Sequence, residues 1–156
     1  MIYNMWEPHQ TSGFLMALFM LSYMMITGTT TGIALFVRIC GLVCHIIVHI
    51  LFYKTLASYL DRDYSLLVSG ISFFVLPKLM FVPEFSNMQI WFLILTSICL
   101  LKYYGKEKIE EQRGKLGYLI AAGFFTALEV FTYPSTIFAF FGVVFFIVLF
   151  SFVICY

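Results

Sequence analysis

The stretch from Lys102 to Lys115, KYYGKEKIEEQRGK, decides how the chain is organised. It holds five of the nine lysine and arginine residues, and long apolar segments lie on both sides of it. Short loops rich in Lys and Arg between transmembrane segments stay on the cytoplasmic side of a membrane. The stretch therefore predicts a membrane protein with this loop inside the cell, and that assignment places every other loop on one side or the other.

The composition supports the same class. Hydrophobic residues make up 62% of the 156 residues and charged residues 11%, and the mean hydropathy is +0.98. A soluble globular domain is about 45–50% apolar and about 25% charged. The net charge of +1 says nothing about nucleic acid, but the sequence has no dense basic patch outside the central loop, so no nucleic-acid partner is expected. We expect a single all-α transmembrane domain over residues 1–156 that has the lipid bilayer as its partner.

Six apolar segments predict six helices. They cover Gly13–Ile26, Ile33–Tyr59, Tyr64–Leu76, Gln89–Leu101, Leu116–Phe131 and a last segment from Ser135 or Thr136 to Tyr156. The first is shorter than the ~20 residues that cross a bilayer. We therefore expect a juxtamembrane half-helix in the outer leaflet, N-capped by Ser12, followed by about five spanning helices. If the first helix spanned instead, Met1 would be cytoplasmic.

The sides of the loops follow by counting from the basic loop. Residues 77–88 form an outer loop, residues 60–63 an inner turn and residues 27–32 an outer turn. Tyr133 and Pro134 end the fifth helix at the outer face, because the residue before a proline avoids helical geometry. The four cysteines all lie in apolar segments, where they are interpreted as small hydrophobic residues rather than disulfide partners.

Polar side chains gather on the outer side in this topology. Charged groups at membrane depth are costly and commonly functional. The topology thus predicts a binding site at the extracytoplasmic surface, and its candidate residues are Glu7, His9, Gln10, Arg38, Lys78, Glu84 and Glu129.

Each candidate has a functional and a structural interpretation. Glu7 and His9 could serve in acid–base chemistry or bind a metal or phosphate, or they belong to a solvated loop. The Arg38 guanidinium could bind a lipid phosphate, or its stem simply extends to the headgroups. Glu129 needs a cavity or a partner, and Arg38 and Lys78 are the cations on its side.

Two further residue groups have the same two interpretations. Lys78 and Glu84 could pair with each other, face a substrate or be solvated. His45 and His49 have the i, i+4 spacing of a metal-binding pair. They have no adjacent carboxylate and no HExxH pattern, so a packed helix interface is the preferred interpretation and no metal site is predicted.

Five segments of the chain carry a resemblance to a known family. They are MWEPHQTSGFLMALFMLSYMMITG (Met5–Gly28), LFVRICG (Leu35–Gly41), YKTLASYL (Tyr53–Leu60), SGISFFVLPKL (Ser69–Leu79) and AAGFFTALEVFTYPS (Ala121–Ser135). They are spread over residues 5–135, so the resemblance extends along most of the chain. They resemble the GT-C superfamily of polytopic glycosyltransferases, the group of protein O-mannosyltransferases and the aminoarabinose transferase.

The resemblance implies transfer of a sugar from a polyprenyl-phosphate donor to an acceptor hydroxyl, at the outer face of a bacterial plasma membrane. Arg38 and Lys78 would stabilise the leaving lipid phosphate. In that family an acidic residue of the first outer loop takes the acceptor proton. This chain has no Asp before Asp61, so Glu7 is the one candidate base and the catalytic residues stay unassigned.

The family pattern also implies a first helix and a C-terminal part that this chain lacks, so we expect a fragment of such an enzyme. No cofactor is predicted, and a divalent metal is an open alternative. The competing hypothesis is a non-enzymatic multi-pass protein, namely a transporter, a flippase-like subunit or an assembly partner.

Overall fold

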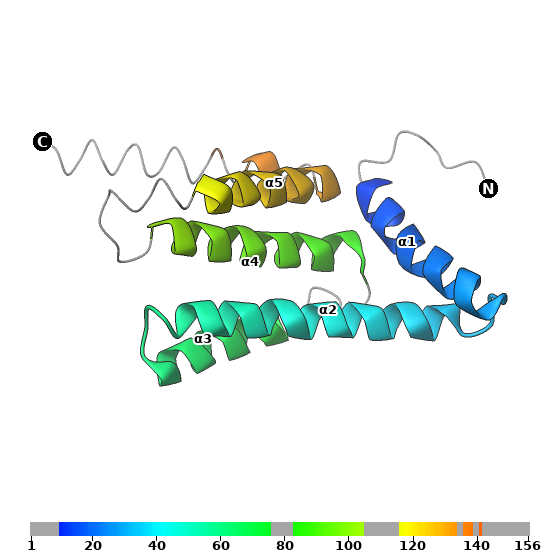
Figure 1. Cartoon of the computed structure of the whole chain (residues 1–156), viewed down its shortest axis with the longest axis horizontal. Coiled ribbons are helices and arrows are strands. Elements are labelled where there is room, and N and C mark those ends of the chain that lie inside the picture. The colour runs from blue at the N-terminus through cyan, green and yellow to red at the C-terminus, as the bar shows by residue number, and fades with distance from the viewer. Residues whose placement is uncertain (1–9, 76–82, 105–115, 134–135, 139–140, 142–156) are drawn as a thin grey trace, which may run out of the picture.

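In a computed structural model of the chain, residues 10–75, 83–104, 116–133, 136–138 and 141 are described. Every secondary-structure element within these ranges is a helix, which confirms the predicted all-α class (Figure 1). The elements are α1 (Gln10–Thr27), α2 (Ile33–Leu56), α3 (Arg62–Phe74), α4 (Phe85–Tyr104) and α5 (Leu116–Thr132). The last predicted helix lies largely outside the described residues, although 136–138 are helical.

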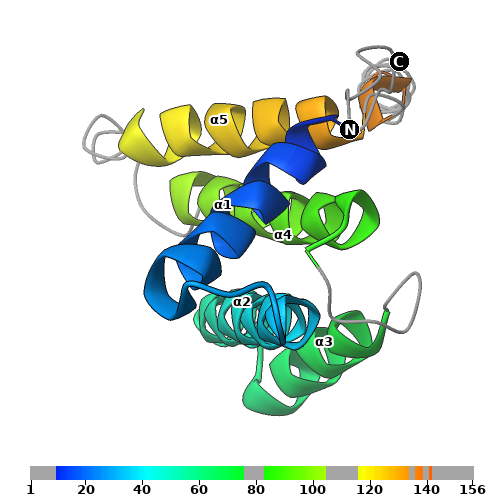
Figure 2. The same ribbon diagram turned by 90° about the vertical axis from the view of Figure 1, so that its right-hand side faces the viewer.

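Helices α2 to α5 share one long axis, and each runs opposite to the one before it (Figure 1). Helix α4 lies between α2 and α5, while α3 packs on the other side of α2 (Figure 2). Helix α1 runs obliquely across one end and contacts α2, α4 and α5. Its course differs from that of the other four helices, and with 18 residues it is longer than the segment from which a half-helix was predicted.

Two of the described helices are long and apolar enough to span a membrane. They are α2, with 24 residues, and α4, with 20. With 13 and 17 residues, α3 and α5 are shorter than the ~20 residues of a full crossing. The described ranges thus contain two helices of spanning length, where the sequence predicted about five.

The interior lies mainly between α2 and α4, whereas apolar side chains also cover the outside. Val48 of α2 packs with Trp91 and Ile94 of α4 in a buried cluster. In contrast, Met25 is 86% exposed and Phe74 is 79% exposed. Soluble monomers rarely expose broad apolar surfaces, so the outer surface of this bundle suits apolar surroundings.

Several predicted helix boundaries were wrong, among them the start of α3, which is Arg62 rather than Tyr64. Helix α1 begins at Gln10, so Ser12 lies within the helix and is not its N-cap. The loop expected to reach Met88 ends at Glu84, because the Met88 N–H donates to the Glu84 carbonyl (2.9 Å) and starts α4 there. Helix α2 ends at Leu56 rather than Tyr59, since the chain turns over residues 57–61.

The turn between α1 and α2 was predicted correctly. Gly28 and Gly32 have φ of 68° and 87°, in the left-handed region that favours glycine. The Tyr23 hydroxyl donates to the Thr31 carbonyl (2.5 Å), and a Cβ on Gly32 would lie 3.0 Å from that hydroxyl oxygen. The two glycines and Tyr23 thereby set the angle between α1 and α2.

Because the helices alternate in direction, their ends lie toward two opposite ends of the bundle (Figure 1). The Arg38 end contains the turn at residues 28–32, the start of α4 and the end of α5. The Lys54 end contains the turn at residues 57–61, the end of α4 and the start of α5. Among the described residues, these turns and helix ends thus group as the predicted loop sides do.

Candidate functional site

The structure describes part of the predicted site. Glu7, His9 and Lys78 lie outside the described residues. Gln10 is the first residue of α1, and its side chain is not described. Arg38, Glu84 and Glu129 are described. Arg38 lies in the second turn of α2, Glu84 directly precedes α4 and Glu129 lies in the last turn of α5, and these helix ends lie toward the Arg38 end (Figure 1).

Arg38 and Glu84 occupy the same level of the bundle. The Trp91 Nε1–H of α4 donates to His45 Nδ1 of α2 at 2.9 Å, and the two helices run in the same direction. Arg38 lies seven residues before His45, and Glu84 lies seven residues before Trp91. The Arg38 side chain is exposed and Glu84 is half-buried, so the exposed cation is the more accessible of the two groups.

Glu129 faces α4 from between two stacked aromatic pairs. Phe125 and Tyr133 lie one turn to either side of it on the same face of α5. Phe125 stacks on Phe92 with ring centroids 6.5 Å apart, and Tyr133 stacks on Phe85 at 5.7 Å. The Glu129 side chain is only 1% exposed. Packing against α4 thus carries a carboxyl group into the apolar interior.

One oxygen of this carboxyl group has no recorded hydrogen-bond partner. Within the described part of the chain, Glu129 Oε2 is buried and unpaired. The Arg38 side chain, which the sequence offered as a partner, is exposed and does not bond that atom. A buried polar group without a partner costs free energy. Oε2 is therefore a position where a proton or a donor group of a ligand would be stabilised.

Sequence reasoning missed the polar residues that lie near Glu129. Gln89 Nε2 donates to Thr136 Oγ1 at 3.1 Å, which joins α4 to the segment after α5. Thr132 is fully buried and its hydroxyl donates to the Leu128 carbonyl at 2.7 Å. The one feature of the sequence that could have indicated these residues is their polar type within apolar segments.

His45 and His49 form part of a buried network that joins three helices. Because Trp91 donates to His45 Nδ1, His45 Nε2 carries the proton and donates to the Phe73 carbonyl (3.0 Å). His49 Nδ1 donates to the His45 carbonyl (2.8 Å), and Ser72 Oγ lies 3.3 Å from His49 Nε2. The interpretation of the two histidines as a packed helix interface is confirmed.

Phe73 explains why the network matters for the fold. It lies in the last turn of α3, where carbonyl groups have no partner inside the helix. His45 supplies that partner from α2, while Trp91 holds the other side of the same ring from α4. In the described ranges, no group of three or more His, Cys, Asp or Glu side chains is placed to hold a metal ion. Cys40, Cys44 and Cys99 are free thiols.

The Arg38 end can thus offer an exposed guanidinium and, deeper in the bundle, a buried carboxyl oxygen. A guanidinium suits a phosphate group, and the carboxyl oxygen suits a hydroxyl donor. No protein-family model, curated protein or solved structure matches the chain.

Proposed function

We propose that this chain is a multi-pass membrane glycosyltransferase module, similar to the GT-C superfamily, that binds a polyprenyl-phosphate sugar at its Arg38 end. In this proposal the Arg38 end faces outward from a bacterial plasma membrane. One observation carries the proposal. The start of α2, the start of α4 and the end of α5, with Arg38, Glu84 and the buried Glu129, lie toward one end, whereas the end of α2, the start of α3 and the end of α4, with Lys54, Arg62 and Lys102, lie toward the other. The end with the lysines matches the cytoplasmic side.

Each residue has a role in the proposed reaction. The acceptor hydroxyl attacks the anomeric carbon of the sugar, and the lipid phosphate leaves with the bonding electrons. Arg38 stabilises the charge that develops on this phosphate, because a positioned cation acts on the transition state more than on the ground state. Glu129 accepts a hydrogen bond from a sugar hydroxyl, and Glu7, which precedes α1, takes the acceptor proton.

Substitution of Arg38 tests the donor site. We would reconstitute the full chain in liposomes and measure binding of tritiated polyprenyl-phosphate mannose. Arg38→Gln should weaken binding by about tenfold or more, since a hydrogen bond to a charged group contributes roughly 1.5–3 kcal/mol. Lys102→Gln removes an exposed cation at the opposite end and is the matched control. Equal binding by wild-type and Arg38→Gln protein would refute the assignment of Arg38.

The second candidate function is a non-enzymatic carrier, and Glu129 favours it as well. Ionisable side chains inside membrane helices often mark proton or ion pathways, and Glu129 is buried with Oε2 unpaired. The two functions differ in their products. A glycosyltransferase releases free polyprenyl phosphate from the labelled donor when an acceptor is present, and Glu129→Gln slows that release. A carrier moves the donor or a proton across the liposome membrane and leaves the donor intact.

A further inference from the structure

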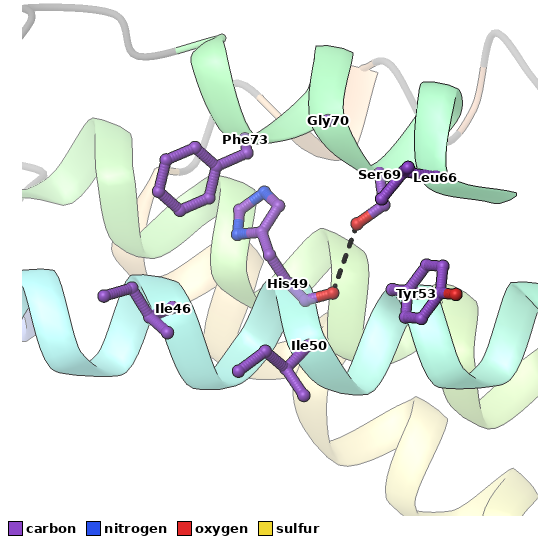
Figure 3. A pocket seen from close by; sticks show the side chains of 8 residues that line it. All are labelled: Ile46, His49, Ile50, Tyr53, Leu66, Ser69, Gly70 and Phe73. Atoms are coloured by element: carbon purple, nitrogen blue, oxygen red, sulfur yellow. Dashed lines mark hydrogen bonds between the residues drawn. The ribbon is translucent and has the colours of Figure 1, made fainter. Parts of the chain in front are cut away.

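A groove of about 270 Å³ lies between α2 and α3 (Figure 3), and neither Arg38 nor Glu129 lines it. Its walls are formed by Ile46, Ile50 and Tyr53 of α2 and by Leu66, Gly70 and Phe73 of α3. Ligand pockets usually measure about 300–1,000 Å³. The α2–α3 groove is therefore suited to a single chain segment rather than to a whole lipid or sugar.

The polar atoms at the base of the groove are already bonded within the protein. His49 points toward α3 between Phe73 and Ser69 (Figure 3). Its Nδ1 contacts the His45 carbonyl and its Nε2 contacts Ser72 Oγ. Ser69 Oγ donates to the His49 carbonyl at 3.2 Å. A polar ligand would lose its hydrogen bonds to water in the groove and would find few free partners there, because these groups are already bonded. A hydrocarbon chain loses no such bonds and is therefore the matching occupant.

Two cations stand just beyond the Lys54 end of the groove. Lys54 follows Ile50 by four residues, and Arg62 precedes Leu66 by four. Each cation therefore lies on the same helix face as a residue that lines the groove, one turn closer to the Lys54 end. Both side chains are exposed. Figure 3 shows the Tyr53 hydroxyl directed away from the other lining residues.

Acidic residues also lie at this turn. Asp61 is the residue before α3, and Asp63 is in its first turn. The N-terminus of a helix carries a partial positive charge that stabilises such carboxylates. Lys54 and Arg62 are the two basic groups at this turn, and their side chains can bind an external anion beside these carboxylates.

We propose that the α2–α3 groove binds one acyl chain of an anionic phospholipid whose phosphate is held by Lys54 and Arg62. Basic side chains at the cytoplasmic surface attract anionic lipids and form headgroup sites between helices. The chain would enter between Tyr53 and Leu66 and extend toward Ile46 and Phe73. This site goes beyond the proposed glycosyltransferase function and does not depend on it.

A photo-crosslinking experiment tests the proposal. The full chain is placed in phosphatidylcholine nanodiscs that contain phosphatidylglycerol with a diazirine in one acyl chain, and labelled peptides are mapped by mass spectrometry. We expect residues 46–53 and 66–73 to be labelled above the exposed face of α5. Label spread evenly over all lipid-facing helices would overturn the proposal.

Gly70 allows the groove to be filled without straining the backbone. It is helical, and a Cβ there would have no heavy atom within 4 Å. Gly70→Phe should reduce the groove label to the level on α5. Gly123→Phe is the matched control, because Gly123 is a helical glycine of α5 with equally open surroundings. Ile46→Trp fills the groove from α2 and serves if Gly70→Phe does not fold. Unchanged groove label in a folded filling variant would contradict the proposal.

The headgroup contacts are tested separately. Lys54→Gln and Arg62→Gln should each lower the groove label by about fivefold, which corresponds to ~1 kcal/mol per basic residue. Lys102→Gln, a cation away from the groove, should leave the label unchanged. If phosphatidylcholine with the same diazirine labels the groove as strongly, or if a polyprenyl phosphate displaces the phosphatidylglycerol probe, the assigned occupant is wrong.

Discussion

At the scale of single residues, the ring of the buried His45 connects three helices. His45 accepts from Trp91 of α4, donates to Phe73 of α3 and presents its own carbonyl to His49. Loss of its ring would leave a buried indole N–H and a buried carbonyl without that partner, and such groups are expensive.

His45→Leu should lower the free energy of unfolding by about 2 kcal/mol or more, because each unsatisfied buried group costs roughly 1–3 kcal/mol. Trp91→Phe should cost less in a His45→Leu background than alone, with a coupling of about 1 kcal/mol. Circular dichroism of denaturant unfolding in detergent measures both. Ile47→Leu, on the exposed face of the same helix, is the control. Strictly additive effects would mean that the 2.9 Å bond contributes nothing.

The sequence predicted part of this network. The spacing of His45 and His49 predicted a shared helix face, because neighbours at i and i+4 lie together. It did not predict Phe73 and Trp91 as partners, since they lie 28 and 46 residues from His45. In the same way, the sequence indicated that Glu129 needed a partner but offered Arg38, whereas the aromatic pairs around Glu129 are set by the packing of α4 on α5.

At the scale of helices and turns, the two glycines between α1 and α2 differ in how much space surrounds their Cβ positions. Gly28 and Gly32 both have positive φ, but only Gly32 has a side chain in contact with its Cβ position, at 3.0 Å from Tyr23 Oη. An L-residue in this region costs roughly 1–2 kcal/mol.

Gly32→Ala should therefore destabilise the protein more than Gly28→Ala, and the difference should shrink when Tyr23 is replaced by Phe, which has no hydroxyl. Thermal unfolding in detergent gives the three comparisons. Equal effects of the two glycine substitutions would show that Tyr23 does not restrain the turn.

Glycine and proline predicted the helix ends that lie next to them. The Tyr133–Pro134 pair predicted the end of α5, and the glycines predicted the end of α1, because backbone restrictions act within a few residues. The start of α4 at Phe85 was missed, since Phe85 stacks on Tyr133 and that contact spans two helices. No rule based on neighbouring residues includes such a contact.

At the scale of the whole molecule, the distribution of charge agrees with the arrangement of the helices. The alternating directions bring Lys54, Arg62 and Lys102 to one end, although they are far apart in the sequence. Hydropathy and the positive-inside rule were enough to predict this arrangement. They misplaced helix boundaries in both directions. Helix α2 is shorter than its apolar segment, because an apolar residue in a turn contributes to a hydropathy run without being helical, whereas α1 and α4 begin earlier than their apolar segments. Both proposed sites require the Arg38 end outside and the Lys54 end inside.

Cysteine labelling in intact cells tests that orientation most directly. In a background without native cysteines, Thr30→Cys marks the Arg38 end and Ala57→Cys marks the Lys54 end, and both positions are exposed. Our account predicts that a membrane-impermeant maleimide labels the Thr30→Cys protein in intact cells and the Ala57→Cys protein only after permeabilisation. The reverse pattern, or labelling of both variants from outside, would contradict it.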